Sequence, residues 1–156
     1  MQNEILILGG LVAYTIIEVE RKTGVNSRKL RFWADKGLFP FVEKDKNGVR
    51  YFSEQDLQWV IWIDCFRQIG MSIPKIKDYI KLCAKGSSTM PQRLSIILNE
   101  RQKVINELTD LQNILQKLDY KAKYYSDMIE KSKDELNPLS KDYAKIKTKR
   151  RKIKSH

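Results

Sequence analysis

The sequence is poor in the residues that build disulfide frameworks, metal centres and acid–base sites. Its 156 residues include two cysteines and one histidine. Cys65 and Cys83 both lie within apolar helical patterns, so we expect free thiols in a reducing cytoplasm. No histidine besides His156 is available for proton transfer, and we recognise neither paired carboxylates nor a phosphate-cradling glycine loop. The sequence therefore does not indicate an enzyme or a cofactor.

Apolar runs long enough to cross a membrane are also lacking. The stretch Ile5–Ala13 is too short to span a bilayer, and Glu4 is its only neighbouring charge, so it lacks the basic region of a secretion signal. We therefore expect no membrane association. Three interpretations of the extension 1–13 stay open: an extra strand, a loose extension, or a start codon placed upstream of the true one.

Positive charge, in contrast, is abundant. Thirty lysines and arginines face nineteen acidic residues, giving a net charge of +11, which favours nucleic acid or an anionic membrane surface as a partner. Residues 131–156 carry ten basic and three acidic residues, and residues 14–84 carry thirteen and nine. We expect 131–156 to be a disordered basic tail that adds at most a non-specific contribution to DNA binding.

Two short helices near the N-terminus have helix-turn-helix spacing. A helical segment opens at Ile16 and stops at Gly24. Asn26 or Ser27 can cap a second helix, which extends to Gly37. The connection Gly-Val-Asn-Ser is short enough for the two helices to pack as one motif.

The second helix carries a cluster of cations. Leu30, and also Trp33, can face inward, which leaves Arg28, Lys29 and Arg31 outside. Such side chains can bind guanine edges or phosphates in a major groove. The alternative is a solvated basic face on an ordinary helix, because short motifs often match by chance.

The segment after this helix predicts a wing. Pro40 prevents the helix from continuing. Two β-prone runs, Val42–Lys44 and Val49–Phe52, flank Asp45–Gly48, where Asn-Gly is a strong hairpin signal because both residues tolerate positive φ. A helix-turn-helix followed by a basic hairpin is a winged helix-turn-helix. The wing would present Lys44, Lys46, Arg50 and Tyr51 to the DNA backbone or an adjacent groove.

Two further helices complete this domain, which we place at 14–86. Ser53 is a predicted N-cap, and the helix after it is apolar nearly all round, so we expect it to be buried. Ser72-Ile73-Pro74 begins the next helix, with proline in its first turn, and this helix ends near Gly86.

A long helix follows at 87–130. No glycine or proline falls between residue 92 and Ile129, and apolar residues recur at steps of three and four, as in a coiled-coil seam. Arg101 interrupts the stripe. About 40 residues at 1.5 Å each make a rod of roughly 60 Å, which favours pairing with a second copy over folding back on the shorter domain. The residues expected at the dimer contact are Leu98, Ile105, Leu108, Leu111, Leu115 and Leu118.

Five segments of the chain follow one another in a recognisable order and spacing: Tyr14–Val19, Thr23–Trp33, Lys36–Pro40, Asn47–Ser53 and Ile69–Lys77. On the strength of these segments, residues 14–129 resemble the MerR family of transcription regulators. The sequence departs from the family's pattern at Lys29, Phe32 and Val49, where Thr, Tyr and Tyr are usual.

The resemblance implies a mechanism. Members of the family bind a promoter palindrome as dimers and distort an overlong spacer so that RNA polymerase can align both promoter elements, a case of indirect readout. Metal-sensing members place cysteines at the start of the long helix and in a loop after it. This chain has no cysteine after Cys83, so we expect no metal site.

Residues 65–121 look like the aldehyde- and thiol-stress (AdhR/NmlR-like) subgroup, in which a single cysteine in the helix after the wing is the proposed sensor. Cys65 matches that position. The alternative is that Cys65 is a small buried hydrophobic residue, because no cation lies three or four residues ahead of it to favour the thiolate. We interpret Cys83 as structural.

The sequence thus predicts a mainly α protein, a winged helix-turn-helix domain followed by a long dimerising coiled-coil helix. We expect it to bind double-stranded promoter DNA as a homodimer and to act on RNA polymerase indirectly. The alternative is an adaptor that binds nucleic acid without sequence preference, which would need neither wing nor recognition helix. The residues expected to contact DNA are Tyr14, Ser27, Arg28, Lys29, Arg31, Trp33, Lys44, Lys46, Arg50 and Tyr51.

Overall fold

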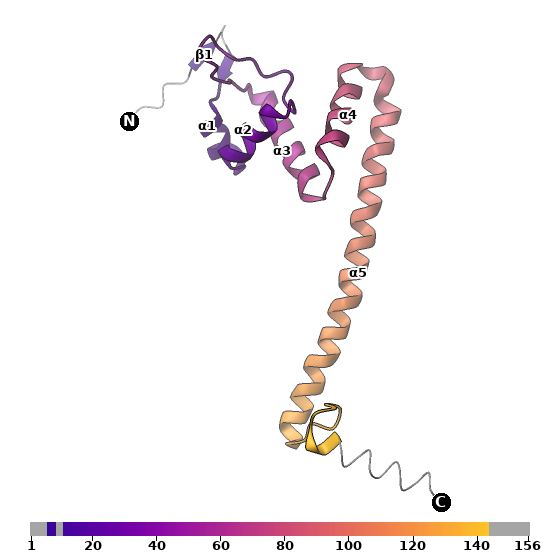
Figure 1. Ribbon diagram of the computed structural model, residues 1–156. Coiled ribbons are helices and arrows are strands. Elements are labelled where there is room, and N and C mark those ends of the chain that lie inside the picture. The colour runs from indigo at the N-terminus through magenta and orange to yellow at the C-terminus, as the bar shows by residue number, and fades with distance from the viewer. Residues whose placement is uncertain (1–5, 9–10, 144–156) are drawn as a thin grey trace, which may run out of the picture. The chain divides into compact units, whose positions relative to one another are not determined.

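A computed structural model of the chain describes residues 6–8 and 11–143. The chain divides into a first unit, Met1–Val104, and a second unit, Ile105–His156. Most of the structure is helical (Figure 1). The elements in chain order are β1 (Leu6–Leu8), β2 (Leu11–Ala13), α1 (Ile16–Thr23), α2 (Ser27–Asp35), α3 (Glu54–Gln68), α4 (Ile73–Ala84), the 3-10 helix η1 (Ser87–Thr89) and α5 (Met90–Lys131).

The N-terminal extension forms a small hairpin. Strands β1 and β2 pair antiparallel, with Ile7 opposite Val12. The chain then forms a bridge between Tyr14 and Phe52, whose backbone N–H and C=O groups exchange two hydrogen bonds of 2.8 Å. Of the three interpretations of the extension, the extra strand agrees with the described residues.

Local signals set the bounds of α1 and α2 close to the predicted ones. Gly24 ends α1 in the left-handed conformation with φ 74°, and its N–H donates to the carbonyl of Glu20. The side chain of Asn26 caps α2 by accepting a 2.8 Å hydrogen bond from the N–H of Arg28. Helix α2 ends at Asp35, and Gly37 follows with φ 75°.

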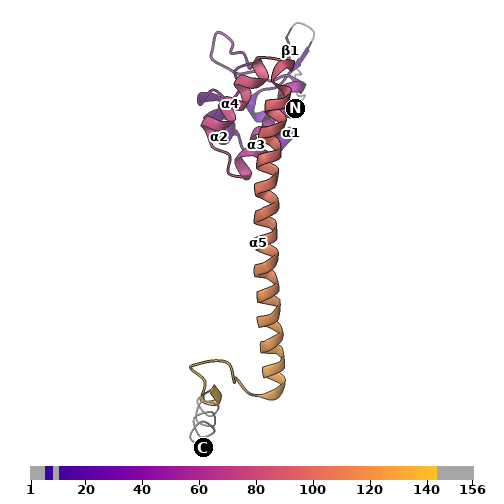
Figure 2. The same cartoon turned by 90° about the vertical axis from the view of Figure 1, so that its right-hand side faces the viewer.

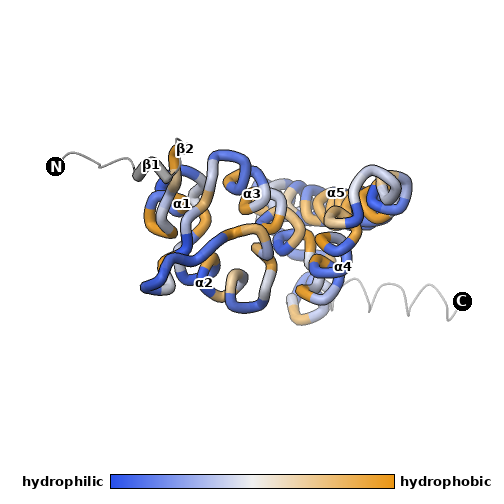
Figure 3. The backbone as a smooth tube through the Cα atoms, turned by 90° about the horizontal axis from the view of Figure 1, so that it is seen from above, coloured by the Kyte–Doolittle hydropathy of each residue, from blue (hydrophilic) through white to orange (hydrophobic). Residues whose placement is uncertain are grey.

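Helices α3 and α4 begin at the predicted caps. The N–H of Ser53 donates to the carboxylate of Asp56 at 2.7 Å, and the Ser53 hydroxyl accepts from the N–H of Asp56. Ser72 caps α4, with Pro74 in the first turn. One core joins α1, α2, α3 and α4, and hydrophobic residues alternate with hydrophilic ones along these helices (Figure 3). Its fully buried side chains include Val19, Leu30, Leu38, Phe52, Val60, Ile63 and Ile76.

Helix α3 is buried on one face only, which corrects the expectation that it is enclosed. Leu57, Val60, Ile63 and Phe66 face the core. On the other side Ile61 is 46% exposed and Trp62 is 54% exposed. The apolar residues of α3 therefore lie on two faces of the helix. One face packs in the core, and the other is exposed to solvent in a single chain.

The corner between α4 and α5 is closed by hydrogen bonds to carbonyl groups that the end of α4 leaves unpaired. The Thr89 hydroxyl lies 2.6 Å from the carbonyl of Leu82 and 2.9 Å from that of Gly86, and Arg93 also donates to Gly86. Ile96 and Ile97 pack against the core. The first unit therefore extends to Val104, beyond the predicted boundary at residue 86.

Helix α5 is a single helix of 42 residues (Figure 2). After it, the chain turns at Ser132 and is held by hydrogen bonds around Asp134. This carboxylate accepts from the Tyr124 hydroxyl and from the side-chain amide of Asn137, and the Asp134 N–H donates to Asp142. Residues 132–143 thus form a defined turn, not the predicted disorder. The rest of the predicted tail, 144–156, lies outside the described residues.

Within residues 6–8 and 11–143, no helix is both long enough and apolar enough to span a bilayer.

Candidate nucleic-acid interface

Helix α2 is oriented by two residues on its inner face. Leu30 is fully buried and Trp33 is 4% exposed, and both belong to the core that includes Val60 and Ile63. The prediction that Trp33 contacts DNA conflicts with this position, because its ring is already enclosed. We assign Trp33 to the hydrophobic core, where it holds α2 in place.

The outer face of α2 carries the predicted cations. Arg28 and Arg31 are exposed, and neither side chain has a hydrogen bond or ion pair within the described part of the chain. The ammonium group of Lys29 lies 3.7 Å from the carboxylate of Asp64 on α3 but stays 59% exposed. Ser27, in contrast, is only half-exposed at the first position of α2. Three cations thus share one accessible helix surface.

The wing is a short loop that turns at Asp45–Gly48. The Gly48 N–H donates to the carbonyl of Asp45, and the side chain of Asp45 accepts hydrogen bonds of 2.8 Å from Asn47 and Val49. Gly48 has φ 78°, whereas Asn47 does not have positive φ.

The wing has less β-structure than the sequence predicts. Its arms form one isolated bridge, between Lys44 and Arg50, and Phe52 leaves the second arm to pair with Tyr14. The prediction of two extended wing strands is therefore only partly realised.

The four predicted wing contacts differ in how freely they project. Lys44 and Lys46 are exposed. The Tyr51 hydroxyl lies 3.5 Å from the carboxylate of Asp45, and Tyr51 is half-buried. Arg50 turns back toward α2, where its guanidinium lies 2.7 Å from the Asp35 carboxylate and its side chain is 15% exposed. The structure thus presents the two lysines outward and holds the arginine inward.

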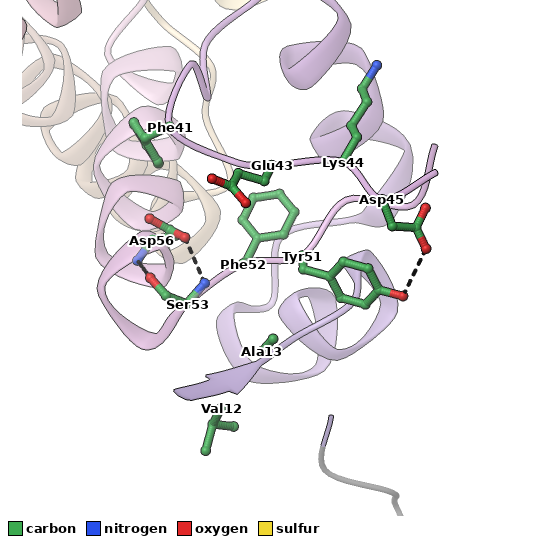
Figure 4. A pocket seen from close by; sticks show the side chains of 10 residues that line it. All are labelled: Val12, Ala13, Phe41, Glu43, Lys44, Asp45, Tyr51, Phe52, Ser53 and Asp56. Atoms are coloured by element: carbon green, nitrogen blue, oxygen red, sulfur yellow. Dashed lines mark hydrogen bonds between the residues drawn. The ribbon is translucent and has the colours of Figure 1, made fainter. Parts of the chain in front are cut away.

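A hollow of about 420 Å³ lies beside the wing (Figure 4). Phe41 and Phe52 contribute apolar walls, and the carboxylates of Asp45 and Asp56 already accept hydrogen bonds from the wing and the start of α3. In Figure 4 the Lys44 side chain points away from Phe52. The hollow therefore contains structural contacts, and Lys44 is free to reach outward.

The side chain of Tyr14 contacts residues at the start of α3 and in α1. Its hydroxyl donates a 2.7 Å hydrogen bond to Glu54, and the ammonium group of Lys22 lies 4.5 Å from the centre of its ring. Lys22 also lies 3.9 Å from the carboxylate of Glu54. This cluster connects α1 to the start of α3 and adds a half-exposed cation that the sequence analysis did not select.

Three further residues at this surface, Phe32, Asp35 and Asp64, were not among the residues predicted from the sequence. Phe32 is 48% exposed, with the ammonium group of Lys36 lying 5.5 Å from its ring centre. Asp35 and Asp64 anchor two of the predicted DNA-binding cations. Local patterns do not reveal such partners, because Arg50 and Asp35 are 15 residues apart in sequence.

The two cysteines occupy different environments. Cys65 is exposed on α3, so the alternative of a buried hydrophobic residue is wrong. Cys83 is partly buried, and a guanidinium nitrogen of Arg93 lies 3.8 Å from its sulfur. Burial, and then the nearby Cys83, raises the pKa of Tyr79 above its usual value. Cys83 thus lies within a packed cluster at the end of α4.

Two short helices with a basic outer face, followed by a basic wing, define a winged helix-turn-helix protein. Residues 14–83 match the model of the MerR HTH family of regulatory proteins. An HTH-type transcriptional regulator of Haemophilus influenzae is 33% identical over 114 residues, covering 73% of this chain and 84% of the relative. The chain belongs to the MerR family of helix-turn-helix regulatory proteins.

Other relatives place the chain within the family. The HTH-type transcriptional regulator AdhR of Bacillus subtilis is 33% identical over 90 residues, covering 58% of this chain and 64% of AdhR. The structure of HiNmlR, a MerR family regulator lacking the sensor domain and solved bound to promoter DNA, matches with a TM-score of 0.73 at 30% identity, covering 83% of this chain and 98% of HiNmlR. These similarities support the AdhR/NmlR-like subgroup.

Proposed function

We propose that this protein is a sequence-specific transcription regulator that binds promoter DNA as a homodimer. The observation that carries the proposal is the outer face of α2, where Arg28 and Arg31 are exposed and unpaired within the described residues, while Leu30 and Trp33 fix the helix from behind. Arginines on a rigid helix can form bidentate hydrogen bonds with guanine in the major groove. The similarity to HiNmlR, which was solved on promoter DNA, supports this assignment.

The wing and Lys29 supply contacts to the DNA backbone. Lys44 and Lys46 are exposed, and Lys29 keeps most of its surface accessible although it lies near Asp64. Exposed lysines bind phosphates as point charges and carry little base information. Arg28 and Arg31 would therefore select the sequence, and the lysines would set register and salt dependence.

Dimerisation uses the exposed apolar stripe of α5. Leu108, Leu111, Leu115 and Leu118 are each between 54% and 63% exposed, and Leu98 is 50% exposed. Ile105 is half-buried. A leucine stripe at steps of three and four forms a coiled coil when a second copy covers it. Two copies of α2 would then read the two halves of a palindrome, and their spacing would be set by the dimer.

The same dimer would act on transcription by changing the shape of the promoter. Contacts at both half-sites offset the energy of bending and untwisting the spacer. RNA polymerase would respond to the altered spacer, so its involvement is indirect. We place the protein in the cytoplasm, where promoter DNA and RNA polymerase are found in bacteria.

Binding of promoter DNA is tested by fluorescence anisotropy at physiological salt, with the duplex upstream of the gene and a scrambled duplex of equal length. We expect tighter binding to the promoter, and a loss of about 1–3 kcal/mol for Arg28→Ala or Arg31→Ala if either side chain reads a base. Lys81→Ala, on α4 beside Asp78, is the control. Equal affinity for both duplexes would instead favour an adaptor that binds without sequence preference.

We further propose that Cys65 senses electrophiles such as aldehydes. Its thiol is exposed on α3, on the side where Ile61 and Trp62 are also exposed. Alkylation would add bulk to this apolar surface, not to the core as expected from the sequence. A modified surface next to α2 would alter how the dimer holds its two DNA-reading helices.

Run-off transcription from the native promoter, with and without an electrophile, tests the sensor. Cys65→Ala should bind DNA almost normally but lose the response. Cys83→Ala is the matched control, because Cys83 lies in the cluster with Arg93 and should leave the response intact. A full response from Cys65→Ala would remove Cys65 as the sensor.

A further inference from the structure

The position of the wing depends on few backbone contacts. Among the described residues, its two arms share the single bridge between Lys44 and Arg50, which two backbone hydrogen bonds form: the Asp45 N–H donates to the Val49 carbonyl at 2.9 Å, and the Tyr51 N–H donates to the Glu43 carbonyl at 3.3 Å. Phe52 then pairs with Tyr14 instead of extending the wing ladder. A ladder this short leaves the tilt of the wing relative to α2 to be fixed by side chains.

Arg50 provides such a side-chain contact. Its guanidinium lies 2.7 Å from the carboxylate of Asp35, and only 15% of its side chain is exposed. Lys44 and Lys46, the other wing cations, are exposed. Arg50 is therefore already held against α2, whereas the lysines project freely.

The partner of Arg50 is the last residue of α2. An acidic side chain at a helix C-terminus is unfavourable, because the helix dipole places partial negative charge there. Helix α2 has no basic residue in its last turn to offset Asp35. Arg50 adds a positive charge from the wing to that of the C-cap residue Lys36, so the contact compensates both the carboxylate and the helix end.

We propose that Arg50 is a positioning residue that fixes the wing against α2 through Asp35, and that it is not the direct DNA contact expected from the sequence. The proposal builds on the proposed DNA-binding function and names the residue pair that sets the geometry of its two DNA-contacting parts. The Lys29–Asp64 pair differs, because it is longer, at 3.7 Å, and leaves Lys29 59% exposed.

Asp35→Asn separates the two roles of Arg50 by the direction of its effect. If Arg50 contacts phosphate, removing the carboxylate frees the guanidinium and lowers the negative charge near DNA, so binding tightens. If Arg50 is a positioning residue, the wing loses its anchor, and affinity for the promoter duplex falls by about two- to fivefold, as expected for a partly exposed ion pair.

Glu43→Gln is the matched control for charge. Glu43 is exposed on the wing, and its carboxylate has no hydrogen bond or ion pair within the described residues. Its neutralisation measures how much binding tightens when one negative charge is removed without disturbing an anchor. Asp35→Asn and Glu43→Gln should therefore shift promoter affinity in opposite directions.

The salt dependence gives a second readout. A phosphate contact releases about one counterion, so its loss would reduce the slope of log affinity against log salt by about 0.9. For Arg50→Gln we expect weaker promoter binding with an unchanged slope. Lys46→Gln should instead reduce the slope, because Lys46 is exposed.

Hydrogen exchange without DNA tests the anchor independently of function. In Asp35→Asn the amides of Val49 and Tyr51, which lie on the second arm of the wing, should exchange faster than in the wild type, whereas Glu43→Gln should not change them. Unchanged exchange in Asp35→Asn, or promoter binding that tightens as in Glu43→Gln, overturns the proposal. A wild-type protein that does not prefer the promoter duplex would refute the proposed function, and the exchange result would still decide the role of the pair.

Discussion

The two units of the chain use hydrophobic residues in opposite ways. In the first unit the buried core residues fall between Val19 and Ile80, and they come from α1, α2, α3, α4 and the segments that join them. In α5 the one buried residue is Glu100, and from residue 101 to 143 every described side chain is at least partly exposed. Leu111 and Leu118, for example, are 63% and 60% exposed.

This difference shows that an apolar stripe of helical period can be covered within the chain or left exposed. Stripes on short helices joined by tight turns cover one another within the chain, so the first unit has its own core. A stripe on a long helix has no partner of its own length within the described residues. Isolated helices gain little stability from propensity alone, so the exposed stripe of the long helix supports the proposed association with a second copy.

The largest effect should come from the core of the first unit. Phe52 is fully buried, and its ring packs edge-on against Phe39 with centroids 5.4 Å apart. Phe52→Ala should reduce the free energy of unfolding by about 3–5 kcal/mol, because it removes a buried ring and leaves a cavity. Urea unfolding followed by tryptophan fluorescence measures the change. Phe32→Ala, at a half-exposed ring, should change it by less than about 0.5 kcal/mol.

The next largest effect is expected in the leucine stripe of α5, which is exposed in the single chain. Leu111→Asp should weaken the proposed dimer by about 100-fold or more, because it would place an unpaired carboxylate in the apolar contact between the two copies. Sedimentation equilibrium measures the dissociation constant. Asn113→Asp adds the same charge on the opposite side of the helix and should leave the dimer intact. Equal dissociation constants for the two variants would show that the leucine stripe is not the interface.

A smaller effect is expected at the helix caps, where a single side chain satisfies backbone groups of the first turn. Ser53→Ala removes the capping hydroxyl of α3 and should reduce the free energy of unfolding by about 1 kcal/mol. Ser126→Ala, at an exposed position inside α5, should be neutral or slightly stabilising because alanine favours helices. Thermal unfolding of both variants measures the difference. A destabilised Ser126→Ala would indicate a contact that the single chain does not have.

The smallest effect is a pH dependence of the first unit. Hydrogen bonds from the backbone N–H and hydroxyl of Thr15 hold the pKa of Glu18 below its usual value of 4.5. A lowered pKa contributes stability above pH 4.5 that is lost as the pH falls through the folded-state value. Glu18→Gln should therefore be less stable than the wild type at neutral pH, with the gap closing below pH 4.5. Urea unfolding at several pH values measures this difference in the free energy of unfolding. A difference that does not change with pH would show that the charge of Glu18 is not its cause.

Much of the first unit could be predicted because its signals are local. Gly24 ends α1, Asn26 caps α2, and Ser53 and Ser72 begin α3 and α4, all within one or two residues of the expected positions. The family was likewise recognised from motifs whose order and spacing are fixed. These signals act over a single helical turn, so the sequence displays them directly.

The errors concern contacts between distant residues. Trp33 lies three residues after Leu30 and shares its inward face, but a pattern alone did not decide between core and DNA. The pairing of Phe52 with Tyr14 and of Arg50 with Asp35 depends on how separate segments meet. The exposure of Cys65 similarly depends on which face of α3 the core covers. Sequence periodicity does not contain this information when a helix is apolar on several sides.

The bridge between Tyr14 and Phe52 also has a consequence for how the protein is made. Protein synthesis proceeds at about 5–20 residues per second, so Phe52 follows Tyr14 by roughly two to eight seconds. Because α1 and α2 precede Phe52 and α3 in the chain, they are synthesised before the strand partner of Tyr14 and the α3 residues against which they pack. The helix-turn-helix therefore cannot complete its core until the downstream chain is available, and a pause in translation after α1 and α2 emerge but before α3 emerges would lengthen the period in which their apolar faces are exposed.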